Sequence, residues 1–103
     1  MGDVTTILLA NGLALPKAGL IAEQQGRMVG AQIAALVRGE APPPPFDGSG
    51  SCYLETGKHT AGLIEGDFFA KPEPIVRLQG VSAAHAEAKR SFESERLARW
   101  FGA

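Results

Sequence analysis

Four consecutive prolines, Pro42 to Pro45, constrain this chain more than any other feature of its sequence. Proline lacks a backbone N–H and has a fixed φ, so neither an α-helix nor a central β-strand can continue through such a run. The run is typical of a stiff polyproline II spacer. Together with the turn-forming residues after it, it predicts a Pro- and Gly-rich linker over 41–50. The chain has 103 residues, and we predict a single domain over 1–103 with the linker inside it.

The part before the linker predicts one long helix. Residues 1–14 are expected to be irregular, because Gly12 interrupts a short apolar run. Pro16 suits the first position of a helix and Gly39 suits a left-handed stop, so the helix is expected over 16–38. Apolar residues recur along it at helical spacing: Ile21, Val29, Ile33, Leu36 and Val37. Small residues occupy every fourth position of a neighbouring stripe, which is expected to pack tightly: Ala22, Gly26, Gly30 and Ala34.

The part after the linker predicts strands and a second helix. Three short runs carry strand-forming residues: 51–55, 61–69 and 75–79. A hairpin turn is expected between the first two, and Ser82 is a suitable N-cap for a helix over 83–101. The whole pattern predicts an α+β fold, with a long N-terminal helix, a small three-stranded antiparallel sheet and a C-terminal helix.

Charge and cysteine content exclude several classes of protein. The net charge is -1, and basic residues are scattered among a similar number of acidic ones, so no nucleic-acid partner is expected. No apolar run is long enough to span a bilayer. Cys52 is the only cysteine, which excludes an internal disulfide and a cysteine-based zinc site, and we predict no metal site. The location is left open between the cytoplasm and the periphery of a membrane.

Four segments form a further pattern when they are taken in order. They are Gly2-Asp3-Val4, the run from Leu15-Pro16-Lys17-Ala18-Gly19 to Gly26, the stretch Ser51-Cys52-Tyr53-Leu54-Glu55-Thr56-Gly57, and the ending from Phe92 to Gly102. Their order and spacing resemble the C-terminal region of the sulfide:quinone oxidoreductase and flavocytochrome c sulfide dehydrogenase family. The resemblance covers essentially this whole chain, but only about the last quarter of such an enzyme.

The resemblance implies contacts with a flavin. Gly2 and Asp3 match the late Gly-Asp motif of the family, whose carboxylate accepts a hydrogen bond from the ribityl chain of FAD. Lys17, Ala18 and Gly19 match the start of the helix that points its N-terminus at the flavin ring. The positive end of that helix dipole would stabilise negative charge on the reduced ring.

Cys52 is the candidate catalytic residue. It matches a family cysteine that cycles between thiol, disulfide and persulfide beside the flavin. Such a cysteine must be accessible and have a lowered pKa, because the thiolate is the nucleophile. The alternative is a small buried apolar residue on a strand, which is the common fate of a lone cysteine.

The chain lacks the other parts of such an enzyme. It contains no Gly-x-Gly-x-x-Gly turn between a strand and a helix, which is the motif that holds the pyrophosphate of FAD. We therefore expect the C-terminal domain or a fragment of an FAD-dependent oxidoreductase, inactive and without cofactor when alone. Its expected partners are the missing FAD- and NAD-type domains, and the parent enzyme would pass electrons to quinone or cytochrome c.

Two other functions stay open. One is a free-standing small protein that associates with itself through the small-residue stripe and the aromatic end of the last helix; a homo-oligomer is expected in either case. The other is the tail of a related NADH:quinone-type flavoenzyme. The aromatic residues suit either a quinone pocket or a core: Tyr53, Phe68, Phe69, Phe92, Trp100 and Phe101. The last helix also suits a membrane surface, through Arg90, Arg96 and Arg99.

Overall fold

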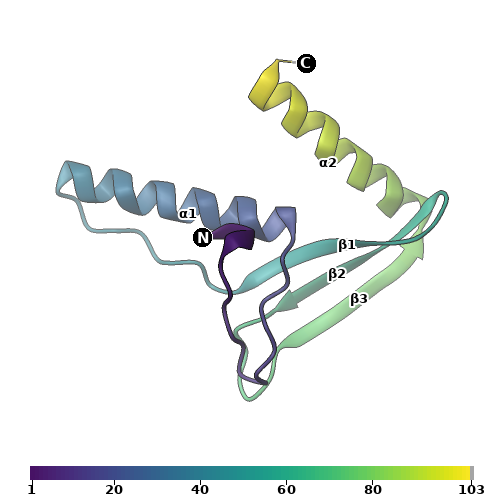
Figure 1. Cartoon of the computed structure of the whole chain (residues 1–103), viewed down its shortest axis with the longest axis horizontal. Coiled ribbons are helices and arrows are strands. Elements are labelled where there is room, and N and C mark those ends of the chain that lie inside the picture. Colours follow the sequence, from purple (N-terminus) through teal and green to yellow (C-terminus); the bar gives the residue numbers. More distant parts are fainter. Residues whose placement is uncertain (103) are drawn as a thin grey trace. The chain divides into compact units, whose positions relative to one another are not determined.

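A computed structural model, which describes residues 1–102, confirms the predicted α+β fold (Figure 1). Two helices and one short turn of 3-10 helix are present: η1 (Gly2–Val4), α1 (Gly19–Arg38) and α2 (Ala83–Phe101). Three strands lie between the long helices: β1 (Ser49–Gly57), β2 (Thr60–Asp67) and β3 (Ile75–Ser82). They form one antiparallel sheet in the order β1-β2-β3. Among the described residues, no helix has the length and apolar character needed to cross a membrane.

The chain forms two compact units. Unit 1 contains residues 1–52 and 65–77, and unit 2 contains residues 53–64 and the chain from Leu78 onward. Each strand of the sheet therefore contributes residues to both units. Helix α1 belongs to unit 1, and helix α2 belongs to unit 2.

Helix α1 begins later than predicted and ends where predicted. Its N-cap is Ala18, whose φ of -133° and ψ of 142° are extended rather than helical. Pro16 therefore lies on the approach to the helix and not at its first position. At the other end Gly39 has a left-handed φ of 70°, and its N–H donates to carbonyls of the last turn. Glycine reaches this conformation at little cost, so the predicted stop is confirmed.

Unit 1 has a core of large side chains. Leu9, Leu15, Ile21 and Phe68 pack together, and Ile21 is only 2% exposed. Strand β1 reaches this core through Gly50, where a Cβ atom would come within 2.8 Å of Cγ1 of Ile21. A side chain at this position would push β1 away from α1, so the glycine permits the close packing of strand and helix.

Unit 2 is built differently. Among its described residues, the buried apolar side chains are those of two alanines, Ala61 and Ala86, which are 0% and 8% exposed. Helix α2 is fixed at its start by Ser82, whose Oγ accepts the N–H of His85 at 3.1 Å, as the sequence predicts. Strand β3 is exposed along nearly its whole length, including Leu78 at 62% and Val81 at 53%. The large apolar side chains of unit 2 thus remain largely at the surface.

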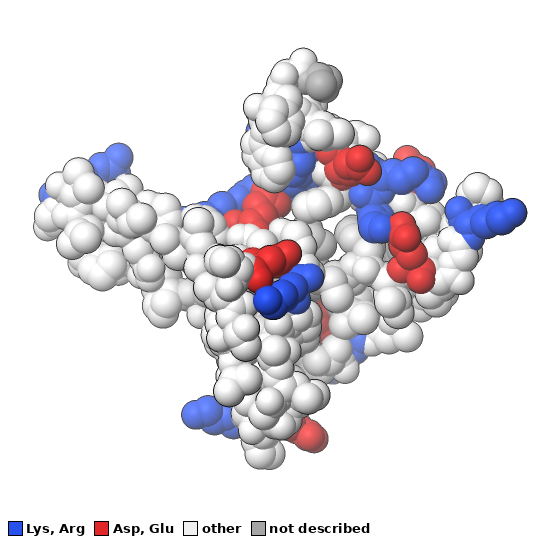
Figure 2. Space-filling view, in the orientation of Figure 1, with Lys and Arg blue, Asp and Glu red and all other residues white. Residues whose placement is uncertain are grey.

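The outer half of α1 is apolar and exposed. Leu36 and Val37 are 78% and 82% exposed. The small-residue stripe contacts the N-terminal turn at its start: a Cβ placed on Gly2 would lie 3.8 Å from Cβ of Ala22, and one on Gly26 would lie 3.9 Å from Cε of Met1. At Gly30, no described atom outside the local backbone of α1 lies within 4 Å of such a Cβ, so the stripe is not covered there. On the face drawn in Figure 2, uncharged atoms cover most of this helix, while cations and anions are interspersed elsewhere.

Candidate functional site

A shallow hollow in unit 1 brings together three of the five residues that the resemblance assigned to a flavin, whereas Ala18 and Gly19 do not line it. Gly2 and Asp3 line it from the N-terminal turn, and Lys17 lines it from the approach to α1. The remaining lining residues come from the same two segments and from the first half of α1: Thr5, Ile7, Leu15, Pro16, Ile21, Ala22 and Gln25. Two stretches that are separate in the sequence thus meet at one place.

One hydrogen bond fixes the N-terminal turn to α1, and two more hold the turn itself. The N–H of Gly2 donates to Oε1 of Gln25 at 2.8 Å. The carbonyl of Gly2 accepts the N–H of Thr5 at 3.1 Å and the Thr5 hydroxyl at 2.7 Å. Gly2 itself has a left-handed φ of 72°, which favours glycine over any other residue. These bonds set the position of Asp3 beside the start of α1.

The start of α1 offers unpaired N–H groups. Its N-cap, Ala18, has no side chain able to accept a hydrogen bond, and its first turn contains no acidic residue. The first intrahelical bond is donated by Ala22 to the carbonyl of Ala18 at 2.8 Å, which leaves the N–H groups of the first turn, beginning with Gly19, without an intrahelical acceptor. With the helix dipole, these donors favour an anion or an electron-rich ligand at this end. Lys17, which is exposed, adds a positive charge nearby.

The hollow is too small to enclose a cofactor. Its enclosed volume is about 10 Å³, which is space for about one water molecule. An isoalloxazine ring could therefore lie against this surface but not inside it. To enclose a ring at this place, a second wall would have to come from another polypeptide segment.

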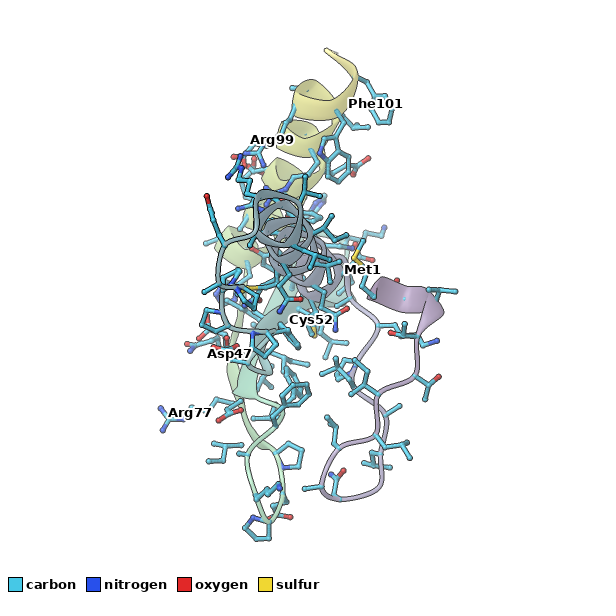
Figure 3. The ribbon with its side chains drawn as sticks, turned by 90° about the vertical axis from the view of Figure 1, so that its left-hand side faces the viewer. Met1, Asp47, Cys52, Arg77, Arg99 and Phe101 are labelled. Atoms are coloured by element: carbon cyan, nitrogen blue, oxygen red, sulfur yellow. The ribbon has the colours of Figure 1, made fainter. Side chains whose placement is uncertain are left out.

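Cys52 lies elsewhere on unit 1. It is half-buried on β1 and is not among the residues that line the hollow (Figure 3). Burial raises the pKa of its thiol above the ordinary value. A raised pKa lowers the fraction of thiolate, which is unfavourable for a nucleophile in this form of the protein. Its redox role stays a prediction.

A larger groove lies next to the hollow in unit 1. Its volume is about 340 Å³, and most of its lining is apolar: Met1, Ile7, Met28, Val29, Pro45, Phe46 and Phe69, with Gln25 and Gln32. Phe46 and Phe69 meet edge to face, with ring centroids 5.4 Å apart and planes at 80°. Of the aromatic residues considered for a quinone pocket, Phe69 lines this groove and Phe68 belongs to the core.

Gln25 is the residue that the sequence analysis missed. It is 6% exposed, and its Oε1 holds Gly2, yet its Nε2 amide has no hydrogen-bond partner among residues 1–102. Every fully buried side-chain nitrogen or oxygen of the described chain has a hydrogen-bond partner. The unpartnered Nε2 of Gln25 is therefore not fully buried and is in contact with solvent. Gln25 lines both the hollow and the groove. The available sequence signal was a glutamine one helical turn after Ile21, on the face that carries the core.

The described residues contain no cluster of His, Cys, Asp or Glu able to hold a metal ion. Comparison with protein-family models, with curated proteins and with solved structures found no match.

Proposed function

We propose that this chain is the C-terminal part of an FAD-dependent oxidoreductase of the sulfide:quinone type. In that enzyme it supplies one wall of the flavin cavity and a subunit interface. The observation that carries the proposal is the shared hollow, which Gly2, Asp3 and Lys17 line together at the open start of α1. The family resemblance assigns these same residues to the flavin.

Each residue of this wall has a distinct task in the proposal. The Asp3 carboxylate accepts a hydrogen bond from a ribityl hydroxyl, because a carboxylate offers only acceptor sites. The first-turn N–H groups of α1, beginning at Gly19, stabilise negative charge that develops on the reduced ring. Lys17 reinforces that positive potential. FAD itself supplies the electron-transfer chemistry when it is bound.

The proposal makes the isolated chain inactive. The hollow holds about one water molecule, so this chain alone has too little surface to retain a flavin. The missing FAD- and NAD-type domains are the required partners. Quinone or cytochrome c is the proposed electron acceptor of the whole enzyme.

A chimera tests the proposal. This chain would replace the C-terminal segment of a characterised sulfide:quinone oxidoreductase, and flavin content would be measured from the visible absorption band after gel filtration. We expect the chimera to retain FAD and Asp3→Ala to lose most of it. Asp47→Ala is the matched control, since Asp47 is also an exposed aspartate of unit 1 but does not line the hollow. Equal flavin content in the two variants would count against the proposal.

Cys52→Ser in the intact parent enzyme separates two substrates. If Cys52 is the redox cysteine, Cys52→Ser abolishes sulfide oxidation and leaves flavin content unchanged. If the parent enzyme is instead of the NADH:quinone type, Cys52→Ser leaves NADH oxidation unchanged.

A second candidate function is a self-associating module. The exposed apolar residues favour it, especially Trp100 and Phe101 at the end of α2, which are 59% and 75% exposed. Surfaces of this kind are commonly covered by another chain. Sedimentation over a range of concentrations tests this candidate, and a strict monomer at high micromolar concentration would refute it.

A further inference from the structure

The apolar groove of unit 1 has the features of an interface that lacks its partner. It has room for one or two large side chains, at about 340 Å³, and none of its lining side chains is charged. The Nε2 amide of Gln25 has no hydrogen-bond acceptor among residues 1–102, although the residue is 6% exposed. A partner that fits must therefore be apolar and uncharged, and it must bring a hydrogen-bond acceptor to Gln25.

The end of α2 has this complementary chemistry. Trp100 and Phe101 are neutral and mostly exposed. Arg99 projects from the opposite side of the helix to Phe101 (Figure 3). The helix ends at Phe101, and the last intrahelical acceptor of its cap is the carbonyl of Ala98, which accepts the N–H of Gly102 at 2.9 Å. The carbonyls of Trp100 and Phe101 follow it and have no donor within the helix. They are the acceptors that the Gln25 amide lacks.

We propose that the groove of one copy receives Trp100 and Phe101 from a second copy of this chain. The apolar rings fill the groove between Phe46 and Val29, and the Gln25 amide donates to a carbonyl of the last turn of α2. The occupant is a second copy because both complementary surfaces, the groove with its free donor and the aromatic helix end with its free acceptors, belong to this one sequence. This contact specifies which surfaces meet in the self-association described above. It rests on that second candidate function and not on the proposed flavin wall.

Trp100 is the only tryptophan, so it reports directly on this contact. The emission maximum of the full chain would be recorded over a range from low to high micromolar concentration, with sedimentation on the same samples. We expect the maximum to shift to shorter wavelength as the chain associates, because the indole leaves water. Association without a spectral shift would overturn the proposed contact while leaving self-association standing.

Two identical substitutions on α1 provide a matched pair. Val29 lines the groove, whereas Val37 is 82% exposed and does not line it. Val29→Glu is expected to weaken association at least about ten-fold, as the loss of a central interface contact does. Val37→Glu is expected to change it less than about two-fold, as a substitution outside the contact does. Equal effects of the two substitutions would overturn the contact.

A third variant tests the contact without any change to α1, where a substitution could disturb folding. Trp100→Ser changes an exposed residue near the end of α2, so the fold is expected to persist, with unchanged helical circular dichroism. Sedimentation should then give a monomer. A Trp100→Ser chain that associates as strongly as the original would refute the proposal. A wild-type chain that is monomeric at every concentration would refute both the contact and the self-associating function, whereas the flavin proposal is tested separately by the chimera.

Discussion

Unit 1 lacks a side-chain cap at the start of its helix, whereas unit 2 lacks a core of large apolar side chains. Unit 1 buries large apolar side chains, such as Ile21 and Phe68, but leaves the polar start of α1 without a cap. Unit 2 buries only small apolar residues, but it closes the start of α2 with Ser82 and leaves Trp100 exposed. Unit 1 therefore leaves polar backbone groups uncapped at a helix start, whereas unit 2 leaves large apolar side chains exposed at a helix end. In the proposals above, the flavin wall belongs to unit 1, whereas the self-association contact joins the groove of unit 1 to the end of α2 from unit 2 of a second copy.

Removal of a core side chain should have the largest effect, and it compares the core of unit 1 with the exposed outer half of the same helix. Ile21→Ala is expected to lower the free energy of unfolding by about 2–5 kcal/mol, because it leaves a cavity in the core of unit 1. Ile33→Ala, on the same helix but 56% exposed, should cost less than about 1 kcal/mol. Urea denaturation followed by circular dichroism measures both. If Ile33→Ala were as costly as Ile21→Ala, the outer half of α1 would be buried in solution.

Glycine substitutions make a second comparison. Gly50→Ala in unit 1 should cost about 1–3 kcal/mol, because the new methyl group would lie 2.8 Å from Cγ1 of Ile21. Gly80→Ala in unit 2 meets no atom within 4 Å, so it should change stability by less than about 0.5 kcal/mol. The same denaturation measurement applies. Equal losses would mean that β3 of unit 2 is closely packed after all.

Substitution of the helix N-caps should change helix stability by a smaller amount, with opposite signs in the two units. Ser82→Ala should destabilise α2 by about 1 kcal/mol, because the N–H of His85 loses its acceptor. Ala18→Ser should stabilise α1 by up to about 1 kcal/mol, because it supplies the missing cap. Hydrogen exchange at the first turn of each helix measures the change. If the uncapped N–H groups at the start of α1 contact the flavin, Ala18→Ser should also weaken flavin binding in the chimera.

The smallest expected effect concerns two exposed carboxylates. Hydrogen bonds from the side chain and backbone of Ser49 lower the pKa of Asp47 in unit 1. A hydrogen bond from Lys89, together with its charge, lowers the pKa of Glu55 in unit 2. Both depressed values stabilise the fold above the unfolded-state pKa, and this stabilisation is lost as the pH falls through the folded-state pKa.

The salt dependence of the two pKa values should distinguish the hydrogen bonds at Asp47 from the charge of Lys89 at Glu55. NMR titrations at low and high ionic strength measure the effect. At high ionic strength the pKa of Glu55 should rise toward its ordinary value, because salt screens the Lys89 charge. The pKa of Asp47 should change less, because its partner is a neutral hydroxyl. Lys89→Met should abolish the salt dependence of Glu55. If both groups responded equally to salt, a long-range charge effect would have to replace the local one.

The order of elements could be predicted because it depends on local chemistry. Gly39 and Ser82 stop and start helices through their own backbone and side chain, and the structure confirms both. The start of α1 was placed too early, since Pro16 is compatible with a helix but does not require one. Strands β1 and β3 extend further than predicted, into Ser49 and Ser82, whose side chains do not favour strands. Strand β2 begins one residue earlier than predicted and ends at Asp67, before the predicted end at Phe69.

The site was only partly predictable. The sequence resemblance named Gly2, Asp3 and Lys17, but only the fold could bring them to one hollow. Gln25 could not be identified, because its role arises from a contact with Gly2 across the chain and from its burial. The burial of Cys52 could not be predicted either, since alternation along β1 is compatible with either face.

Reconstitution from two parts tests the central claim most directly. This chain would be mixed with a sulfide:quinone-type oxidoreductase that lacks its own C-terminal segment, and bound FAD would be measured after gel filtration. We predict that neither part retains FAD alone and that the mixture retains about one FAD per complex, since the two parts complete one cavity. Stoichiometric FAD on this chain alone, or no gain on mixing, would contradict the account.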